Sequence, residues 1–135
     1  MSSEEMLISV SDGKLDFGDY SLFTKAKKPD FEFNGDIYKV KTYRDITKLE
    51  RNELFVYESV PGTRVTGFSE DGQGVVFCVE GYEDTQITLE LEAGTEYDVF
   101  IDGTSTGRMK TNLGGKLVLS VELGITAKEV RVVKA

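Results

Sequence analysis

The sequence contains no histidine, and this absence removes several classes of active site. A Ser-His-Asp triad, a Cys-His pair and a histidine-ligated zinc site all need an imidazole, which is also the commonest general base near neutral pH. The single cysteine, Cys78, allows no internal disulfide and no zinc or iron–sulfur site built from cysteines alone. We therefore predict no metal, no cofactor and no catalytic residue.

Long apolar segments are also missing. No stretch approaches the roughly 18 apolar residues of a membrane-spanning helix, and the start, Met1–Glu5, lacks the basic and apolar regions of a secretory signal. Together with the single cysteine, these features predict a cytoplasmic protein. The net charge of −8 disfavours nucleic acid and anionic membrane surfaces as partners.

Strand and turn signals recur every eight to twelve residues along the chain. In Gln86–Glu92, for example, apolar Ile87 and Leu89 alternate with polar residues, as expected of a strand with one solvent-exposed face. Asn34-Gly35 is a strong hairpin signal, because both residues tolerate positive φ. The pattern predicts an all-β protein built as an antiparallel β-sandwich of the jelly-roll or immunoglobulin-like kind.

A chain of 135 residues fits one domain. We predict a single β-sandwich domain over residues 1–135, less regular over 1–60 and with regular sandwich strands over 64–134.

Four further segments carry local signals. Asp45–Asn52 is the one candidate for a short helix, because Asp45 is a suitable N-cap and two apolar residues follow three apart. Tyr20–Phe23 is predicted as a short strand and Lys25–Pro29 as a basic loop ended by proline. Pro61-Gly62 fits a type II turn.

The sulfur and aromatic residues are predicted to serve the core. Cys78 lies in an apolar strand, which favours a buried thiol over a reactive one. Most of the six tyrosines and eight phenylalanines occupy inward positions of the alternating pattern, where they bury large areas.

Acidic residues near two strand ends are the only candidate site. The candidate set consists of five acidic residues and one tyrosine: Glu80, Tyr82, Glu83, Asp84, Asp98 and Asp102. Such carboxylates are commonly just solvated surface residues. They are also the groups that bind sugars or, as a pair, hydrolyse a glycosidic bond. Their spacing does not match a calcium-binding loop.

Four segments carry a resemblance to a known group of proteins: Phe31-Glu32-x-Asn34-Gly35-Asp36-x-Tyr38-Lys39-Val40-Lys41-Thr42, Phe55-Val56-Tyr57-Glu58-Ser59-Val60-Pro61-Gly62-Thr63, Asp84-x-Gln86-Ile87-Thr88-Leu89-Glu90-Leu91-Glu92 and Met109-Lys110-Thr111-Asn112-Leu113-x-Gly115-Lys116. The chain resembles small Firmicutes proteins labelled endosialidase. Its segment Tyr97–Val121 is also similar to accessory β-sandwich modules of polysaccharide-degrading enzymes. No sialidase motif is matched by residues here, so the resemblance implies no catalytic residue.

Two functions are consistent with these observations. The first is a non-enzymatic binding or assembly module, which pairs with a protein partner or with its own copies through exposed sheet edges. The alternative is a glycan-binding protein or a carboxylate-based glycan hydrolase, which predicts a groove lined by exposed tyrosines or facing carboxylates.

Overall fold

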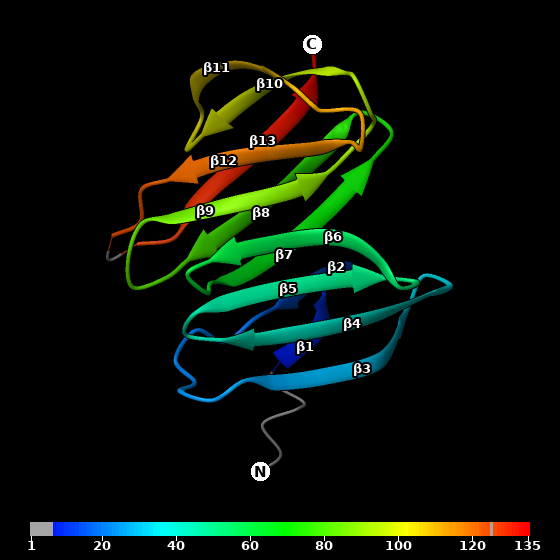
Figure 1. The fold of residues 1–135 in the computed structure, drawn as a ribbon, viewed down its shortest axis with the longest axis vertical. Helices are drawn as coiled ribbons and strands as arrows, with labels where there is room; N and C mark the ends of the chain where they lie inside the picture. Colours follow the sequence, from blue (N-terminus) through cyan, green and yellow to red (C-terminus); the bar gives the residue numbers. More distant parts are fainter. Residues whose placement is uncertain (1–6, 125) are drawn as a thin grey trace.

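The computed structural model describes residues 7–124 and 126–135, which form two stacked β-sheets (Figure 1). Within these residues there are thirteen strands and no helical element: β1 (Ile8–Ser11), β2 (Lys14–Phe17), β3 (Ala26–Phe33), β4 (Asp36–Tyr43), β5 (Ile46–Arg51), β6 (Leu54–Val60), β7 (Arg64–Asp71), β8 (Gly74–Glu80), β9 (Thr85–Glu90), β10 (Glu96–Ile101), β11 (Thr104–Lys110), β12 (Lys116–Val121) and β13 (Lys128–Lys134).

The strands divide between a seven-stranded and a six-stranded sheet. The seven-stranded sheet has the order β1-β2-β7-β8-β13-β10-β11, and the six-stranded sheet, which lies in front in Figure 1, has the order β12-β9-β6-β5-β4-β3. Neighbouring strands pair antiparallel throughout. The predicted all-β antiparallel sandwich is therefore confirmed.

Apolar residues from both sheets form one continuous core. At its centre Tyr57 packs edge-to-face against Phe17 and Phe77, with ring centroids 5.3 and 5.7 Å away. The alternating rows predicted from the sequence, such as Ile87 and Leu89, point into this core. Burying each such side chain stabilises the fold by about 1.5–3 kcal/mol.

The connections between strands gather at two opposite ends of the sandwich. Segments 18–25, 44–45, 61–63 and 81–84 meet at the end that lies on the left in Figure 1. We call it the tyrosine end, because it carries Tyr20 and Tyr82. The turns after β5, β7 and β9 lie at the other end.

The Asn34-Gly35 hairpin forms as predicted. Asn34 has φ 51° and Gly35 has φ 82°, and the turn joins β3 to β4. Both residues tolerate positive φ, which a tight two-residue turn requires.

The predicted helical turn at 45–52 is wrong, because this segment is strand β5. Its side chains alternate, with Thr47 and Leu49 buried and Lys48 on the outer face. β5 pairs with β4 on one side and β6 on the other. Hydrogen bonds to two neighbouring strands outweigh a weak local helical preference.

The basic segment before the first hairpin was also misassigned. Lys25–Pro29, predicted as a loop, lies mostly in β3, the edge strand of its sheet. Pro29 is tolerated there because an edge strand has N–H groups without a ladder partner, and the pairing register shifts between Lys28 and Phe31. Tyr20–Phe23, predicted as a strand, belongs instead to the connection from β2 to β3.

Two smaller predictions are corrected as well. The Val60–Pro61 peptide bond is cis and Gly62 lacks the positive φ of a type II turn. Gly62 is required for a different reason, since a Cβ here would overlap the carbonyl oxygen of Tyr43. Cys78, predicted to be buried, is half-buried on the outer face of β8. The core side of that strand is formed by Val75, Phe77 and Val79.

Candidate functional site

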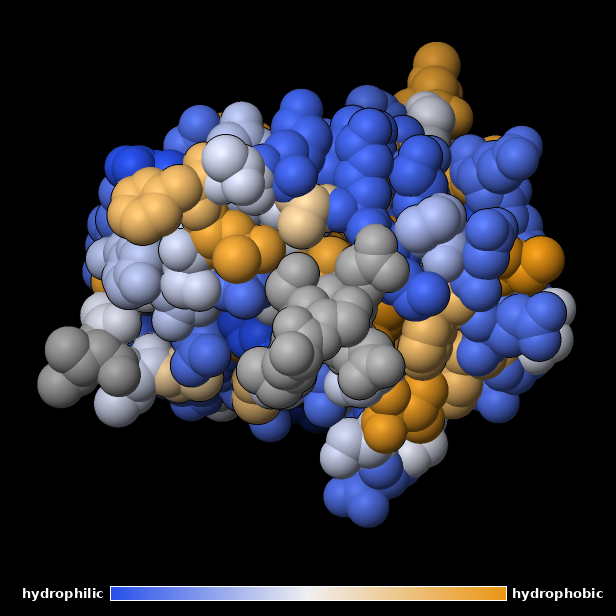
Figure 2. All heavy atoms as spheres, turned by 90° about the horizontal axis from the view of Figure 1, so that it is seen from below, coloured by the Kyte–Doolittle hydropathy of each residue, from blue (hydrophilic) through white to orange (hydrophobic). Residues whose placement is uncertain are grey.

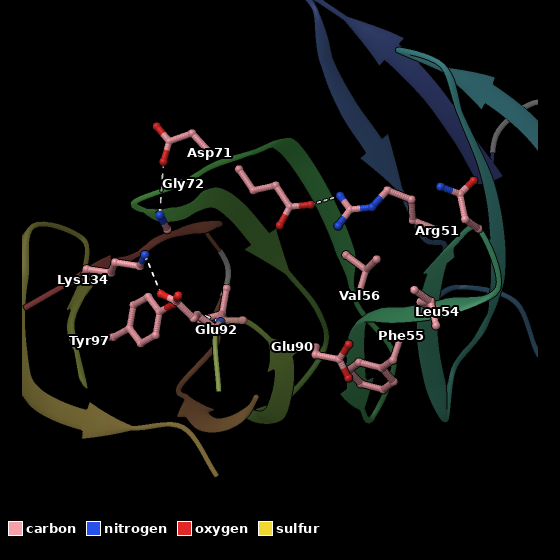
Figure 3. A pocket seen from close by; sticks show the side chains of 14 residues that line it. Arg51, Leu54, Phe55, Val56, Asp71, Gly72, Glu90, Glu92, Tyr97 and Lys134 are labelled. Carbon is pink, nitrogen blue, oxygen red and sulfur yellow. Dashed lines mark hydrogen bonds and ion pairs between the residues drawn. The ribbon is translucent and has the colours of Figure 1, made fainter. Parts of the chain in front are cut away.

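A cleft of about 500 Å³ opens between the two sheets at the end of the sandwich opposite the tyrosine end (Figure 3). Leu54, Phe55 and Val56 of β6 form its apolar part. Charged residues from both sheets surround them, including Glu90 and Lys134.

Ion pairs across the two sheets bridge this cleft. Arg51 of β5 binds Glu70 of β7, and Lys134 of β13 lies 2.6 Å from Glu92 after β9. The hydrogen bond to Glu92 raises the pKa of Lys134. These two ion pairs connect the two sheets across the cleft.

The tyrosine end presents an exposed aromatic pair. Tyr82 is 75% exposed, and its ring makes an edge-to-face contact with the ring of Tyr20, with centroids 4.7 Å apart and planes at 89°. Edge-to-face contact is a favourable aromatic geometry, so the contact with Tyr20 restrains the position of the Tyr82 ring. Partial burial raises the pKa of Tyr20, and nearby Glu80 raises it further.

Two hollows flank this aromatic pair. One of about 320 Å³ is lined by Asp19, Arg64 and Glu80 beside the two rings. The other, of about 260 Å³, is lined by Arg44 and Glu83 beside the same rings. Each hollow therefore combines an aromatic wall with a guanidinium donor and carboxylate acceptors.

A buried network of hydroxyl groups holds the loops beneath these hollows. Thr42 Oγ1 accepts the backbone N–H of Asp19, and it lies 2.8 Å from Thr47 Oγ1. Thr47 in turn donates to the carbonyl of Thr63 and accepts the N–H of that residue. Among the described residues, no buried side-chain polar atom lacks a partner. The loop conformation is therefore fixed from below.

Backbone hydrogen bonds tie the same loops to one another. The Gly62 N–H donates to the carbonyl of Arg44, and the Arg44 N–H donates to the carbonyl of Leu22, each at 2.9 Å. Three separate connections thus form one surface, which favours a preorganised site.

The structure brings together only part of the predicted site. Glu80, Tyr82 and Glu83 line the two hollows. Asp84 follows them directly, but its carboxylate accepts the backbone N–H of Leu123 at 2.9 Å. Its role is to join two connections of the sandwich.

The remaining two predicted residues lie on β10 and in the turn after it. Asp98 is paired with Arg108 at 3.0 Å on the neighbouring strand β11. Asp102 accepts the backbone N–H of Glu129 at 2.8 Å. Neither residue lines the hollows beside Tyr82.

Sequence reasoning missed Tyr20, Arg44 and Arg64. Each comes from a different connection or strand end, so no local pattern joins them to Tyr82. The sequence held no signal for them, since Tyr20 was predicted to lie in a strand and both arginines are distant from Tyr82 along the chain.

Within residues 7–124 and 126–135, no group of three or more acidic or cysteine side chains is placed to hold a metal ion. The same residues contain no helix with the length and apolar character needed to cross a membrane. No protein-family model, curated protein or solved structure is significantly similar to the chain. The resemblances drawn from the sequence stay predictions.

Proposed function

We propose that this protein is a non-enzymatic glycan-binding module and that the tyrosine end is its binding surface. The observation that carries the proposal is the ring of Tyr82, exposed between two hollows that each offer an arginine and a carboxylate. A sugar presents an apolar face that stacks on an aromatic ring, and hydroxyl groups that both donate and accept hydrogen bonds.

Binding without hydrolysis is favoured by how two of the predicted acidic residues are used. Asp84 and Asp102 accept backbone N–H groups that hold connections in place. A carboxylate committed in this way is poorly suited to move as a nucleophile or an acid. The absence of histidine from the sequence adds to this preference.

Calorimetry with soluble neutral and acidic polysaccharides tests the proposal. We expect Tyr82→Ala to weaken binding about tenfold, because it removes one stacked ring. Tyr82→Phe keeps the ring and should bind nearly as well as the wild type. Leu113→Ala is the matched control, since Leu113 is 94% exposed but follows β11 at the other end. Unchanged affinity of Tyr82→Ala, or no binding to any polysaccharide, would reject the proposal.

A second candidate function is assembly with a copy of the same chain, and a specific edge strand favours it. β3 is interrupted by Pro29 and a register shift, and β11 by a register shift opposite Val99 and Phe100. β1 has only four residues. Such features protect edges against pairing with another strand.

β12 has none of these protections. It pairs with β9 in an unbroken register, and no strand lies on its other side in the part of the chain that the structure describes. The carbonyl of Lys116 points away from β9, where it accepts the Asn112 N–H. The antiparallel alternation then directs the backbone groups of Val118 and Ser120 outward as well.

A twofold axis at Leu119 makes this edge self-complementary. Val118 of one copy then faces Ser120 of the other, so the outward groups of both can exchange hydrogen bonds. In the same register Lys116 faces Glu122, which pairs opposite charges.

Light scattering at micromolar concentration tests this candidate. We expect a wild-type dimer that Val118→Lys converts to a monomer, because a lysine on an edge discourages strand pairing. Val10→Lys on the β1 edge is the matched control, since Val10 is 44% and Val118 45% exposed. A monomeric wild type would refute it.

A further inference from the structure

Five lysines cluster on the outer face of the six-stranded sheet in a protein of net charge −8, and a sixth, Lys116 of β12, lies on the same face. Three of them stand in one row across three strands, because Lys27 of β3 faces Lys41 of β4, and Lys41 faces Lys48 of β5. Lys39 lies two residues along β4 from Lys41, and Lys25 lies over the ring of Tyr43, 5.7 Å from its centroid. We call these five residues the lysine face.

Two of the five lysines of the lysine face have a glutamate on the neighbouring strand, but none of the five forms an ion pair within the described residues. The ion pairs found within the described residues involve Lys116, Lys134 and three arginines, and none of the five lysines. Glu50 faces Lys39 and Glu58 faces Lys48 without forming an ion pair. Both cross-strand neighbours of Lys41 are lysines.

This arrangement costs free energy in the folded protein. Like charges directly opposite one another on a sheet repel. Partial burial lowers the pKa of Lys41, and the charges of the other four lysines lower it further. An anion bound over the row would relieve the repulsion, which is a reason for such a row to persist on an acidic protein.

The lysine face is continuous with the tyrosine end. Tyr43, beneath Lys25, is followed by Arg44, which lines the hollow beside Tyr82. Arg44 also lies over the exposed ring of Phe23, 5.6 Å from its centroid. In the view from below, the side on which β3 lies in Figure 1, hydrophilic side chains cover much of the surface, with apolar side chains between them (Figure 2). A ligand at Tyr82 can therefore extend onto the lysines.

We propose that the lysine face binds the carboxylate or sulfate groups of an acidic polysaccharide whose chain extends from the tyrosine end. The choice of a polysaccharide rests on the proposed function, whereas the choice of an anion rests on the lysines alone. Duplex DNA is a less suitable partner because it carries one negative charge per about 1.7 Å of its axis, more densely than one carboxylate per sugar, so the negative remainder of the protein repels it more strongly. An anionic membrane is disfavoured for the same reason, since its surface potential is negative.

The test compares charge-matched variants by calorimetry with polygalacturonate, a neutral polysaccharide, duplex DNA and anionic lipid vesicles. The variant Lys27→Gln/Lys41→Gln/Lys48→Gln should bind polygalacturonate about tenfold more weakly than the wild type. Added salt should weaken wild-type binding more than that of the variant. The control Lys14→Gln/Lys110→Gln/Lys128→Gln makes the same change in net charge on strands of the other sheet and should bind as the wild type does.

The outcomes separate this inference from the proposed function. Loss of polygalacturonate binding in the lysine variant with no effect of Tyr82→Ala would support the lysine face and reject the tyrosine end. Binding of the neutral polysaccharide that depends on Tyr82, without polygalacturonate binding, would support the tyrosine end as a binding surface and reject the lysine face. Equal losses in the lysine variant and its control, or tighter binding of DNA or vesicles than of polygalacturonate, would overturn the inference.

Discussion

The phenol oxygen of Tyr57 lies 2.8 Å from Oγ1 of Thr63, in a fully buried position beneath the tyrosine end. Thr63 Oγ1 is also 2.7 Å from the hydroxyl of Ser59. The ring of Tyr57 meanwhile packs among the core phenylalanines. One side chain thus links the hydrophobic core to the hydroxyl network that supports the candidate binding loops.

Tyr57→Phe should destabilise the fold by about 1–2 kcal/mol, because it removes one partner of a buried hydrogen bond and leaves the ring in place. Urea unfolding followed by circular dichroism measures the difference. Tyr82→Phe is the control and should have no comparable effect, since Tyr82 is exposed. A Tyr57→Phe variant as stable as the wild type would show that the hydrogen bond between Tyr57 and Thr63 is energetically neutral.

Stability should also fall at alkaline pH through the same residue. Burial raises the pKa of Tyr57 above its ordinary value of 10.0, so the folded state keeps a proton that the unfolded state releases. This contribution is fully present below pH 10 and is lost as the pH rises above it. Urea unfolding from about pH 9 to pH 11 should show a steeper decline for the wild type than for Tyr57→Phe. Parallel declines would contradict the assignment to Tyr57.

Gly62→Ala should destabilise the protein by about 1–3 kcal/mol, because a methyl group there overlaps the Tyr43 carbonyl oxygen and the backbone must move. Gly72→Ala is the matched substitution, since Gly72 also lacks positive φ and has open space around its Cβ position. Thermal unfolding of both variants gives the comparison. Similar unfolding temperatures of the two variants would mean that the loop at Gly62 rearranges without loss of stability.

Lys41→Gln should stabilise the protein at low ionic strength, by about 0.5 kcal/mol, because it removes repulsion from the lysines on both neighbouring strands. Added salt should reduce the gain. Lys14→Gln, on the other sheet, should not stabilise, because the protein as a whole is negative. A stabilisation of Lys41→Gln that does not depend on salt would point to a cause other than charge.

The architecture was predictable where local pattern and long-range packing agree. Ile87 and Leu89 alternate with polar neighbours, and Asn34-Gly35 carries its own turn geometry, so strand and hairpin follow from the residues themselves. Residues 45–52 were misread because the spacing of Ile46 and Leu49 also fits a helix. Only pairing with β4 and β6 resolves that ambiguity, and such pairing is invisible in a local window.

The candidate site was less predictable, for a related reason. Lys27, Lys41 and Lys48 become neighbours only through the registers of two strand pairs. Tyr20 meets Tyr82 because two distant connections reach the same end of the sandwich. Glu80, Tyr82 and Glu83, which were predicted together, are close in sequence and needed no such information.

The position of β12 at one edge of the six-stranded sheet, with β4 near the other edge, sets a length scale. If two copies join through β12, their six-stranded sheets become one sheet with a lysine face near each end. At about 4.8 Å per strand, the two β4 strands would lie about 40 Å apart. A polysaccharide longer than this gap gains avidity by occupying both copies, and a shorter one does not. Such a dimer would therefore select polysaccharides by their chain length.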